Sequence, residues 1–135
     1  MEGKNIIEWK DEYSVGVKVF DTHHKTLFQY INEFYQDVYA GANKTKIKKH
    51  LNRFTEYADF HLKAEEEMFD KYEYPGKKEH VIEHENYRKE VKRFLASNRQ
   101  DIEFYFGILE FLKDWWLKHV MVVDKKYEDF FAGKI

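Results

Sequence analysis

Five histidines and two carboxylates stand at positions where the spacing of the apolar residues calls for another apolar residue. They are His24, His61, Glu65, His80, His84, His119 and Asp124. Burying such groups without partners costs several kcal/mol each, so something in the core must compensate them. Imidazole and carboxylate donors suit iron, manganese or zinc, and seven ligands are too many for one tetrahedral zinc ion. The pattern therefore predicts a site for two metal ions and leaves the metal open.

The spacing within these seven residues fits coordination at a helix surface. Two pairs are four residues apart, which places both side chains of a pair on one helix face. These pairs are His61 with Glu65 and His80 with His84. His119 and Asp124 are five residues apart, and they would diverge by roughly 140° in a regular α-helix of 3.6 residues per turn. Asp124 could still serve the same site by reaching across to bridge two metals.

Three clusters of turn-forming residues divide the chain into segments too long to be strands. They are Gly41-Ala42-Asn43, Tyr74-Pro75-Gly76 and Ser97-Asn98. Between them, apolar residues recur every three or four positions, which indicates amphipathic helices. We expect one all-α domain over residues 1–135, with an irregular arm at 1–20 and helices at about 21–40, 44–72, 76–96 and 100–131. Short connections favour antiparallel neighbours and hence an up-down-up-down four-helix bundle.

Such a bundle would bring the seven polar residues to one end. The start of the first helix, the end of the second, the start of the third and the end of the fourth lie at the same height in this topology. With a rise of ~1.5 Å per residue, all seven side chains can then gather in one layer of the core.

Composition limits the remaining possibilities. The chain has 135 residues, of which 43% are hydrophobic and 36% charged, as in soluble globular proteins. The formal charge of −2 argues against a nucleic-acid binder. No apolar run is long enough for a membrane span, and the N-terminus lacks the apolar core of a secretory signal, so we expect a cytoplasmic protein and a monomer. There is no cysteine, which excludes thiolate ligands and disulfides.

Four motifs in order along the chain resemble the hemerythrin family over nearly its whole length. They are FDTHHKTL ending the arm and opening the first helix, HLKAEEEMF, YPGKKEHVIEH and WWLKHVMVVDKKY. Trp9 and the YSVG segment of the arm belong to the same resemblance. Each motif alone is weak evidence, but all seven ligand positions of the family carry the expected residue type here.

The resemblance implies a cofactor of two non-haem irons and the role of each ligand. His80, His84 and His119 would hold one iron, and His24 and His61 the other. The two carboxylates, with an oxo or hydroxo group, would bridge the pair. The second iron would keep an open position at which dioxygen binds reversibly. The implied function is oxygen storage, delivery or scavenging without catalysis, and delivery would also need a protein recipient.

Some residues near the ligands have less certain roles. Where the family pattern leads us to expect Gln or Glu, this chain has His23, which we interpret as a surface residue or as one lying behind a ligand. We interpret His50 as a surface residue. Five apolar residues within four positions of ligands could wall an oxygen pocket or simply belong to the core. They are Leu27, Leu62, Trp115, Trp116 and Val120.

Other chemistries remain in competition at this stage. Ferritin-like di-iron enzymes use Glu-x-x-His pairs, and this sequence has none. The segment HVIEH matches a zinc-peptidase motif with Glu83 as the base, but the chain is short for such an enzyme and the other ligands would stay unexplained. A peroxidase, a nitric-oxide-reacting enzyme or an oxygen sensor could use the same two irons.

Overall fold

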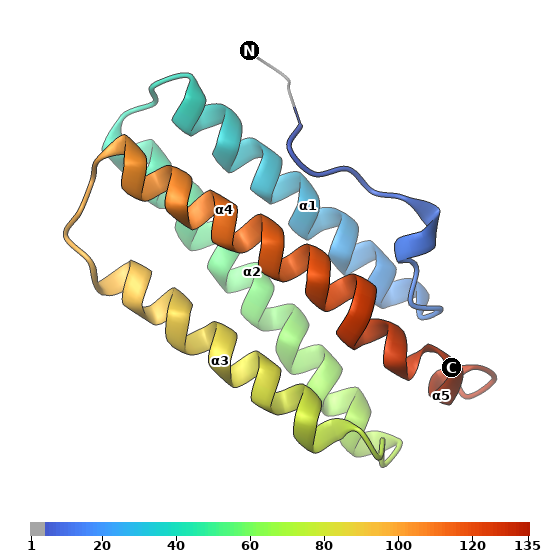
Figure 1. The fold of residues 1–135 in the computed structure, drawn as a ribbon. Coiled ribbons are helices and arrows are strands. Elements are labelled where there is room, and N and C mark those ends of the chain that lie inside the picture. The colour runs from blue at the N-terminus through green and yellow to red at the C-terminus, as the bar shows by residue number, and fades with distance from the viewer. Residues whose placement is uncertain (1–4) are drawn as a thin grey trace.

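The computed structural model describes residues 5–135, and over that range it is helical with no strands (Figure 1). Four long helices pack antiparallel, α1 against α2 and α4, and α2 against α3. Their bounds are α1 Lys18–Tyr39, α2 Lys44–Lys71, α3 Lys77–Ala96 and α4 Ile102–Lys118. This arrangement confirms the all-α, up-down-up-down bundle with an irregular N-terminal arm. No helix in residues 5–135 is long and apolar enough to cross a membrane.

The connections between helices lie where the sequence places its turn-forming residues. Gly41 follows α1 with a φ of 74°, a left-handed conformation that glycine adopts without steric cost. The side chain of Asn43 caps α2 by accepting a hydrogen bond from the backbone N–H of Lys46, and Asp101 caps α4 through the N–H of Phe104. Local sequence thus ends and restarts the helices at defined points.

The described part of the arm, residues 5–17, runs beside α1 and is tied to it by buried side chains (Figure 1). The side-chain oxygen of Asn32 accepts hydrogen bonds from the backbone N–H groups of Ile6 and Ile7, and its amide donates to the carbonyl of Ile7. At the other end of the arm, Asp21 accepts hydrogen bonds from Ser14 and from the N–H of Val15. Residues 1–4 of the expected arm lie outside the described range.

The last helical segment differs from the uninterrupted helix expected over 100–131. After α4 ends at Lys118, His119–Val123 forms a π-helical turn, Asp124–Tyr127 a 3₁₀ turn, and α5 spans Glu128–Phe131. In the π-turn the backbone N–H of Asp124 bonds to the carbonyl of His119, five residues earlier. Such wide turns recur at functional sites because they change which side chains share a helix face.

Two hydrophobic clusters enclose the layer that holds the polar residues. The larger fills the bundle and includes, beside the polar layer, Leu27, Leu62, Trp116 and Val120. The smaller closes the end of the bundle with Val15, Val17, Phe20, Phe69, Tyr127 and Phe131. The polar layer is therefore screened from water on both sides, and interactions between charges within it are strong.

Candidate metal centre

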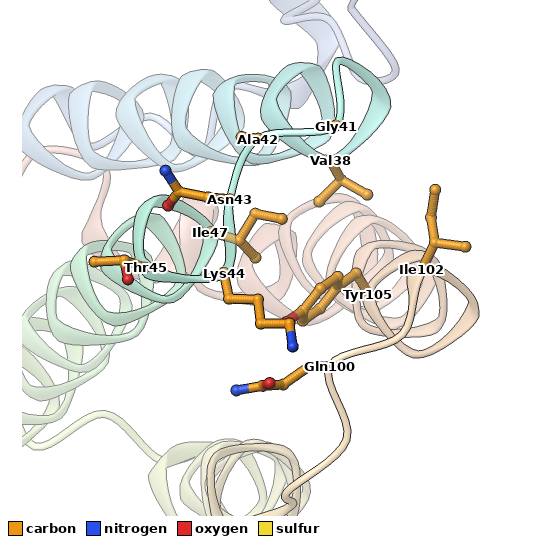
Figure 2. A pocket seen from close by; sticks show the side chains of 10 residues that line it. All are labelled: Val38, Gly41, Ala42, Asn43, Lys44, Thr45, Ile47, Gln100, Ile102 and Tyr105. Carbon is orange, nitrogen blue, oxygen red and sulfur yellow. The ribbon is translucent and has the colours of Figure 1, made fainter.

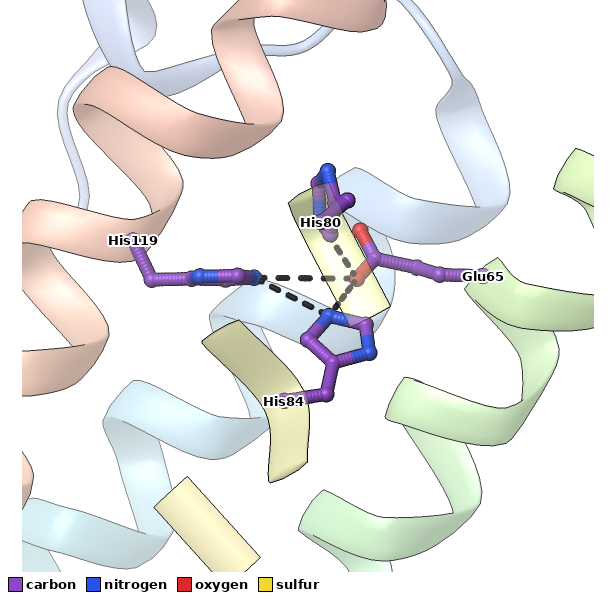
Figure 3. A group of neighbouring side chains, drawn as sticks. All are labelled: Glu65, His80, His84 and His119. Atoms are coloured by element: carbon purple, nitrogen blue, oxygen red, sulfur yellow. Dashed lines mark hydrogen bonds and ion pairs between the residues drawn. The ribbon is translucent and has the colours of Figure 1, made fainter. Parts of the chain in front are cut away.

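Seven buried side chains form two adjacent groups, each able to hold a metal ion. One group is Glu65, His80, His84 and His119, and the other is His24, His61, Glu65 and Asp124. None of the seven is more than 3% exposed. Figure 3 shows three histidines from two helical segments converging on one carboxylate oxygen of Glu65, which comes from a third. Every ligand position predicted from the sequence thus lies in one layer, as the height of each residue in the bundle requires.

The distances between imidazole nitrogens are also those expected around a shared ion. The Nε2 atoms of His24 and His61 are 3.0 Å apart, and those of His84 and His119 are 3.3 Å apart. Two nitrogens at ~2.1 Å from one ion and at right angles to each other would be about 3.0 Å apart. Each approach suits a hydrogen bond if one ring carries its proton on Nε2, and it suits a shared cation if neither ring does.

Each carboxylate offers one oxygen to each group. Oδ1 of Asp124 lies 2.8 Å from Nε2 of His80, while Oδ2 lies 3.1 Å from Nε2 of His24. Oε1 of Glu65 lies 3.1 Å from Nε2 of His84, while Oε2 lies 3.5 Å from Nε2 of His61. This is the placement that a carboxylate needs if it is to bridge two ions.

The π-turn explains how Asp124 reaches the layer together with His119. Oδ1 of Asp124 is 3.0 Å from Nε2 of His119, although the two residues are five apart in sequence. A regular α-helix would have turned the aspartate away by roughly 140°. The wider turn places both side chains on the inward face, so the difficulty in the sequence spacing disappears.

Several inward-facing atoms make no hydrogen bond of acceptable geometry among the described residues, although ion-pair distances join them to one another. They are Oε1 of Glu65, Nε2 of His80 and both carboxylate oxygens of Asp124. Buried polar atoms are almost always satisfied, and leaving one bare costs about 1–3 kcal/mol. Bare lone pairs from imidazoles and carboxylates that face one another are the donor set of a metal site, so the residues present fit two metal ions.

The charges in this layer shift the titration of its members strongly. Burial opposes ionisation of Asp124 and Glu65, yet the surrounding histidines outweigh it and hold the pKa of both carboxyls below the usual value. Burial likewise opposes a charge on His119, but Asp124 and Glu65 raise its pKa to about 10. For His61 burial prevails over Glu65, and the pKa falls to about 4. Without metals, then, the layer contains two anionic carboxylates that need positive charge.

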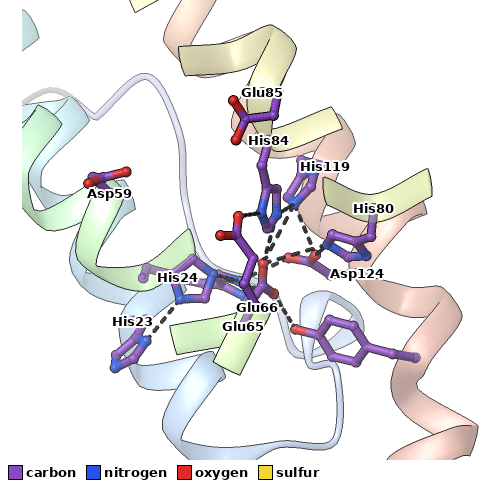
Figure 4. Close-up of polar contacts among 12 residues, drawn as sticks. His23, His24, Asp59, Glu65, Glu66, His80, His84, Glu85, His119 and Asp124 are labelled. Atoms are coloured by element: carbon purple, nitrogen blue, oxygen red, sulfur yellow. Dashed lines mark hydrogen bonds and ion pairs between the residues drawn. The ribbon is translucent and has the colours of Figure 1, made fainter. Parts of the chain in front are cut away.

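A second row of residues holds some of the histidines from behind (Figure 4). The Nδ1 atom of His84 is 2.7 Å from Oε2 of Glu66, and Arg88 donates to the same oxygen at 2.9 Å and to Asp59 at 3.0 Å. Burial opposes ionisation of Glu66, but the hydrogen bonds from His84 and Arg88 lower its pKa. His84 therefore has an anionic partner that is itself fixed by an ion pair.

Tyr127 is a further buried contact to the layer. Its hydroxyl donates to Oε2 of Glu65 at 2.6 Å, and its ring stacks on His80 at 5.7 Å between centroids. Neither Tyr127 nor the Glu66–Arg88 pair was predicted from the sequence. Glu66 is one of three consecutive glutamates, which sequence alone does not separate, and the direction of Tyr127 depends on the 3₁₀ turn after Asp124.

His23 lies behind a ligand, one of the two interpretations that the sequence allowed. Its Nδ1 is 2.8 Å from Nδ1 of His61, and its side chain is buried, with 8% exposed. Burial, with the nearby His24, lowers its pKa and so favours the uncharged ring. His50 lies near the start of α2, half-buried beside Asp37 at 2.8 Å and far from the layer.

The five residues proposed for an oxygen pocket differ in burial and in their contacts. Leu27, Leu62, Trp116 and Val120 have no exposed surface, and the Trp116 ring lies 5.9 Å from that of His61 and 6.0 Å from that of His119. Trp115 is only partly buried and stacks flat on the outer side of His119, with 4.4 Å between centroids. Its position suits holding His119 in place more than enclosing a small ligand.

A surface cavity lies at the opposite end of the bundle, away from the metal-binding layer (Figure 2). It measures about 540 Å³ and lies where the α1–α2 connection faces the start of α4. Val38, Ile47, Ile102 and Tyr105 form its apolar lining, with Lys44 at the rim. None of the seven candidate ligands contributes to this cavity.

Fold and site together define a four-helix protein with a buried pair of metal-binding groups. The family model described as the hemerythrin HHE cation binding domain matches residues 15–130. A bacteriohemerythrin of Clostridium acetobutylicum is 31% identical over 90% of this chain and 98% of its own length, and one of Methylococcus capsulatus is 30% identical over 86% and 88%. A myohemerythrin of Sipunculus nudus is 24% identical over 89% of each chain. The chain belongs to the hemerythrin family.

Proposed function

We propose that the protein binds dioxygen reversibly at two non-haem irons held by the seven buried side chains. The observation that carries the proposal is the unequal division of histidines, three in one group and two in the other, with Glu65 and Asp124 within reach of both groups. His80, His84 and His119 with both carboxylates offer five donors to one iron. His24 and His61 with the same carboxylates offer four to the other. The ion held by His24 and His61 would have fewer side-chain donors and so could take a further small ligand such as dioxygen.

The surroundings of the layer support binding rather than turnover. When bound, two irons supply the electrons that hold dioxygen and take them back on its release. Residues of the chain position the irons and keep water away: apolar clusters lie on both sides, and Leu27 and Trp116 have no exposed surface. Excluding water and protons slows the loss of bound oxygen as peroxide. The printed names of the relatives, bacteriohemerythrin and myohemerythrin, agree with a carrier. A cytoplasmic location and a monomeric state stay predictions.

The test is iron analysis combined with absorption spectra under air and under vacuum. We expect two irons per chain and a colour that appears with air and disappears on deoxygenation over repeated cycles. Protein that stays colourless after reconstitution with ferrous salt would end the proposal. A colour that never reverses, together with steady-state turnover of peroxide or nitric oxide, would indicate a di-iron enzyme instead.

Leu27→Asn should speed the spontaneous oxidation of the oxygenated protein several-fold. Leu27 lies one helical turn after His24 and is fully buried, so an amide there would bring a polar group and water toward the open iron position. The measurement is the decay of the oxygenated spectrum in air at fixed temperature.

Leu109→Asn is the matched control for this substitution. Leu109 is also buried, at 2% exposed, but lies in α4 ten residues before His119, about 15 Å along the helix. Both variants lose stability through a buried amide, and only Leu27→Asn should speed oxidation. Equal decay rates in the two variants would place Leu27 outside the oxygen pocket.

A further inference from the structure

His23 is a buried histidine with one polar contact among the described residues, and that contact is the outer nitrogen of a candidate ligand. Its ring packs against Phe20, Tyr57 and Phe60, with centroids 5.2 to 5.9 Å away. Its Nδ1 lies 2.8 Å from Nδ1 of His61. A buried imidazole enclosed by aromatic rings and aimed at another imidazole has little freedom to turn away.

The contact defines how both rings carry their protons. Nε2 of His61 faces the metal layer, 3.0 Å from Nε2 of His24, so a metal there requires the lone pair on that atom. The proton of neutral His61 must then be on Nδ1, which donates to Nδ1 of His23. His23 accepts with its own lone pair and carries its proton on Nε2. The pair thus fixes the tautomer of His61 that a metal needs.

In the other group, the residue behind a histidine is a carboxylate and not an imidazole. His84 donates its outer N–H to Glu66, whose carboxylate also accepts a hydrogen bond from Arg88. A carboxylate behind a histidine ligand raises the basicity of the ligand more than a neutral imidazole does. The buried Nδ1 atoms of His24 and His119 have no partner in residues 5–135. The two metal positions therefore differ in support from behind as well as in donor number.

We infer that His23 is the positioning residue for His61, and that an imidazole in place of a carboxylate behind this ligand makes the His24–His61 position the more weakly held of the two metal positions. The inference rests on the proposed function only in requiring two bound metals, and it does not depend on dioxygen. Geometry carries it: the 2.8 Å contact, the burial of both rings, and the contrast with the ion-paired Glu66.

Release of Fe²⁺ to an excess of a ferrous chelator under nitrogen tests the inference. The wild-type protein should lose its two irons in two phases, the faster from the His24–His61 position. His23→Leu removes the acceptor and should speed the fast phase roughly 10- to 100-fold while the slow phase changes little. His23→Gln keeps an acceptor and should restore a nearly wild-type rate. This rescue would not occur if His23 only filled space, because Leu fills it too.

Two exchanges of charge provide the matched controls. His23→Glu places a carboxylate behind His61 and should slow the fast phase. Glu66→Gln removes the charge behind His84 and should speed the slow phase alone. Circular dichroism of the metal-free variants shows whether each still folds.

The outcomes separate this inference from the proposed function. A wild-type chain that binds two irons, combined with equal release rates for His23→Leu and His23→Gln, would overturn the role of His23 alone. A slow phase that responds to His23 and a fast phase that responds to Glu66 would reverse the assignment of the two positions and overturn the inference as well. A wild-type chain that binds fewer than two irons would instead remove the di-iron proposal.

Discussion

Glu65→Ala should leave the protein with less than one tightly bound iron per chain. Glu65 belongs to both groups of ligands, with one oxygen 3.1 Å from His84 and the other 3.5 Å from His61. Removing it takes a donor from each iron together with one of the two bridges and one of the two buried negative charges. The two dications would then repel each other with only Asp124 to compensate their charge. Iron analysis after gel filtration, with the absorption spectrum, measures the effect.

Glu67→Ala is the control for Glu65→Ala. Glu67 lies two residues further along α2 with its side chain exposed. Its substitution makes the same change of charge and helix propensity as Glu65→Ala but does not alter the metal-binding layer. It should bind two irons with the wild-type spectrum. A Glu65→Ala protein that also kept two irons and that spectrum would contradict the bridging role on which the di-iron proposal rests.

The candidate ligand set could be predicted from the sequence because helical periodicity reveals polar residues at positions where apolar ones are expected. His61 and Glu65 interrupt an otherwise apolar stripe, and only a shared inward face explains both. The turn clusters set the lengths of the helices, and those lengths bring the ends of α2 and α4 level with the starts of α1 and α3. Local rules were therefore sufficient for the fold and for which residues meet.

What the sequence could not supply depends on contacts between helices and on irregular backbone. The π-turn at His119–Val123 is not encoded by a glycine or proline, so Asp124 remained the awkward ligand until its backbone was known. His23 lies ~100° around the helix from His24, and it reaches His61 only because α1 and α2 pack closely there. Which of three consecutive glutamates supports His84 likewise depends on the rotation of α2 against α3.

Removing the metals should lower the midpoint of thermal unfolding by on the order of 20 °C or more. A ligand present at a thousand times its Kd stabilises the folded state by about 4 kcal/mol per site, and each kcal/mol moves the midpoint by roughly 2–8 °C. Metal-free protein must in addition keep anionic Glu65 and Asp124 buried among histidines without the ions. Differential scanning calorimetry of loaded and stripped protein at the same pH measures the difference. Equal midpoints would mean that the layer does not bind metal.

The pH dependence of stability should differ between metal-free and metal-loaded protein, because the groups that titrate lie in the metal-binding layer. In metal-free protein the pKa of His119 is raised to about 10, so the stability gained from its protonated form is complete below about 6.5 and is lost as the pH rises toward 10. The lowered pKa of His61, about 4, acts in the opposite sense: its contribution is present above about 6.5 and lost as the pH falls. Stripped protein should therefore be most stable near neutral pH and weaken on both sides.

Metal-loaded protein should not show the loss of stability that metal-free protein shows as the pH rises above neutral. In loaded protein, Nε2 of His119 and of His80 would each donate its lone pair to a metal, so neither ring has a proton to lose between pH 7 and pH 10. The metal ions would then supply the positive charge that faces Asp124. Chemical unfolding at pH 7 and pH 9.5, with and without iron, provides the comparison. If stripped and loaded protein weakened equally toward alkaline pH, groups outside the layer would be responsible, and the buried charges described here would not govern the stability of the metal-free fold.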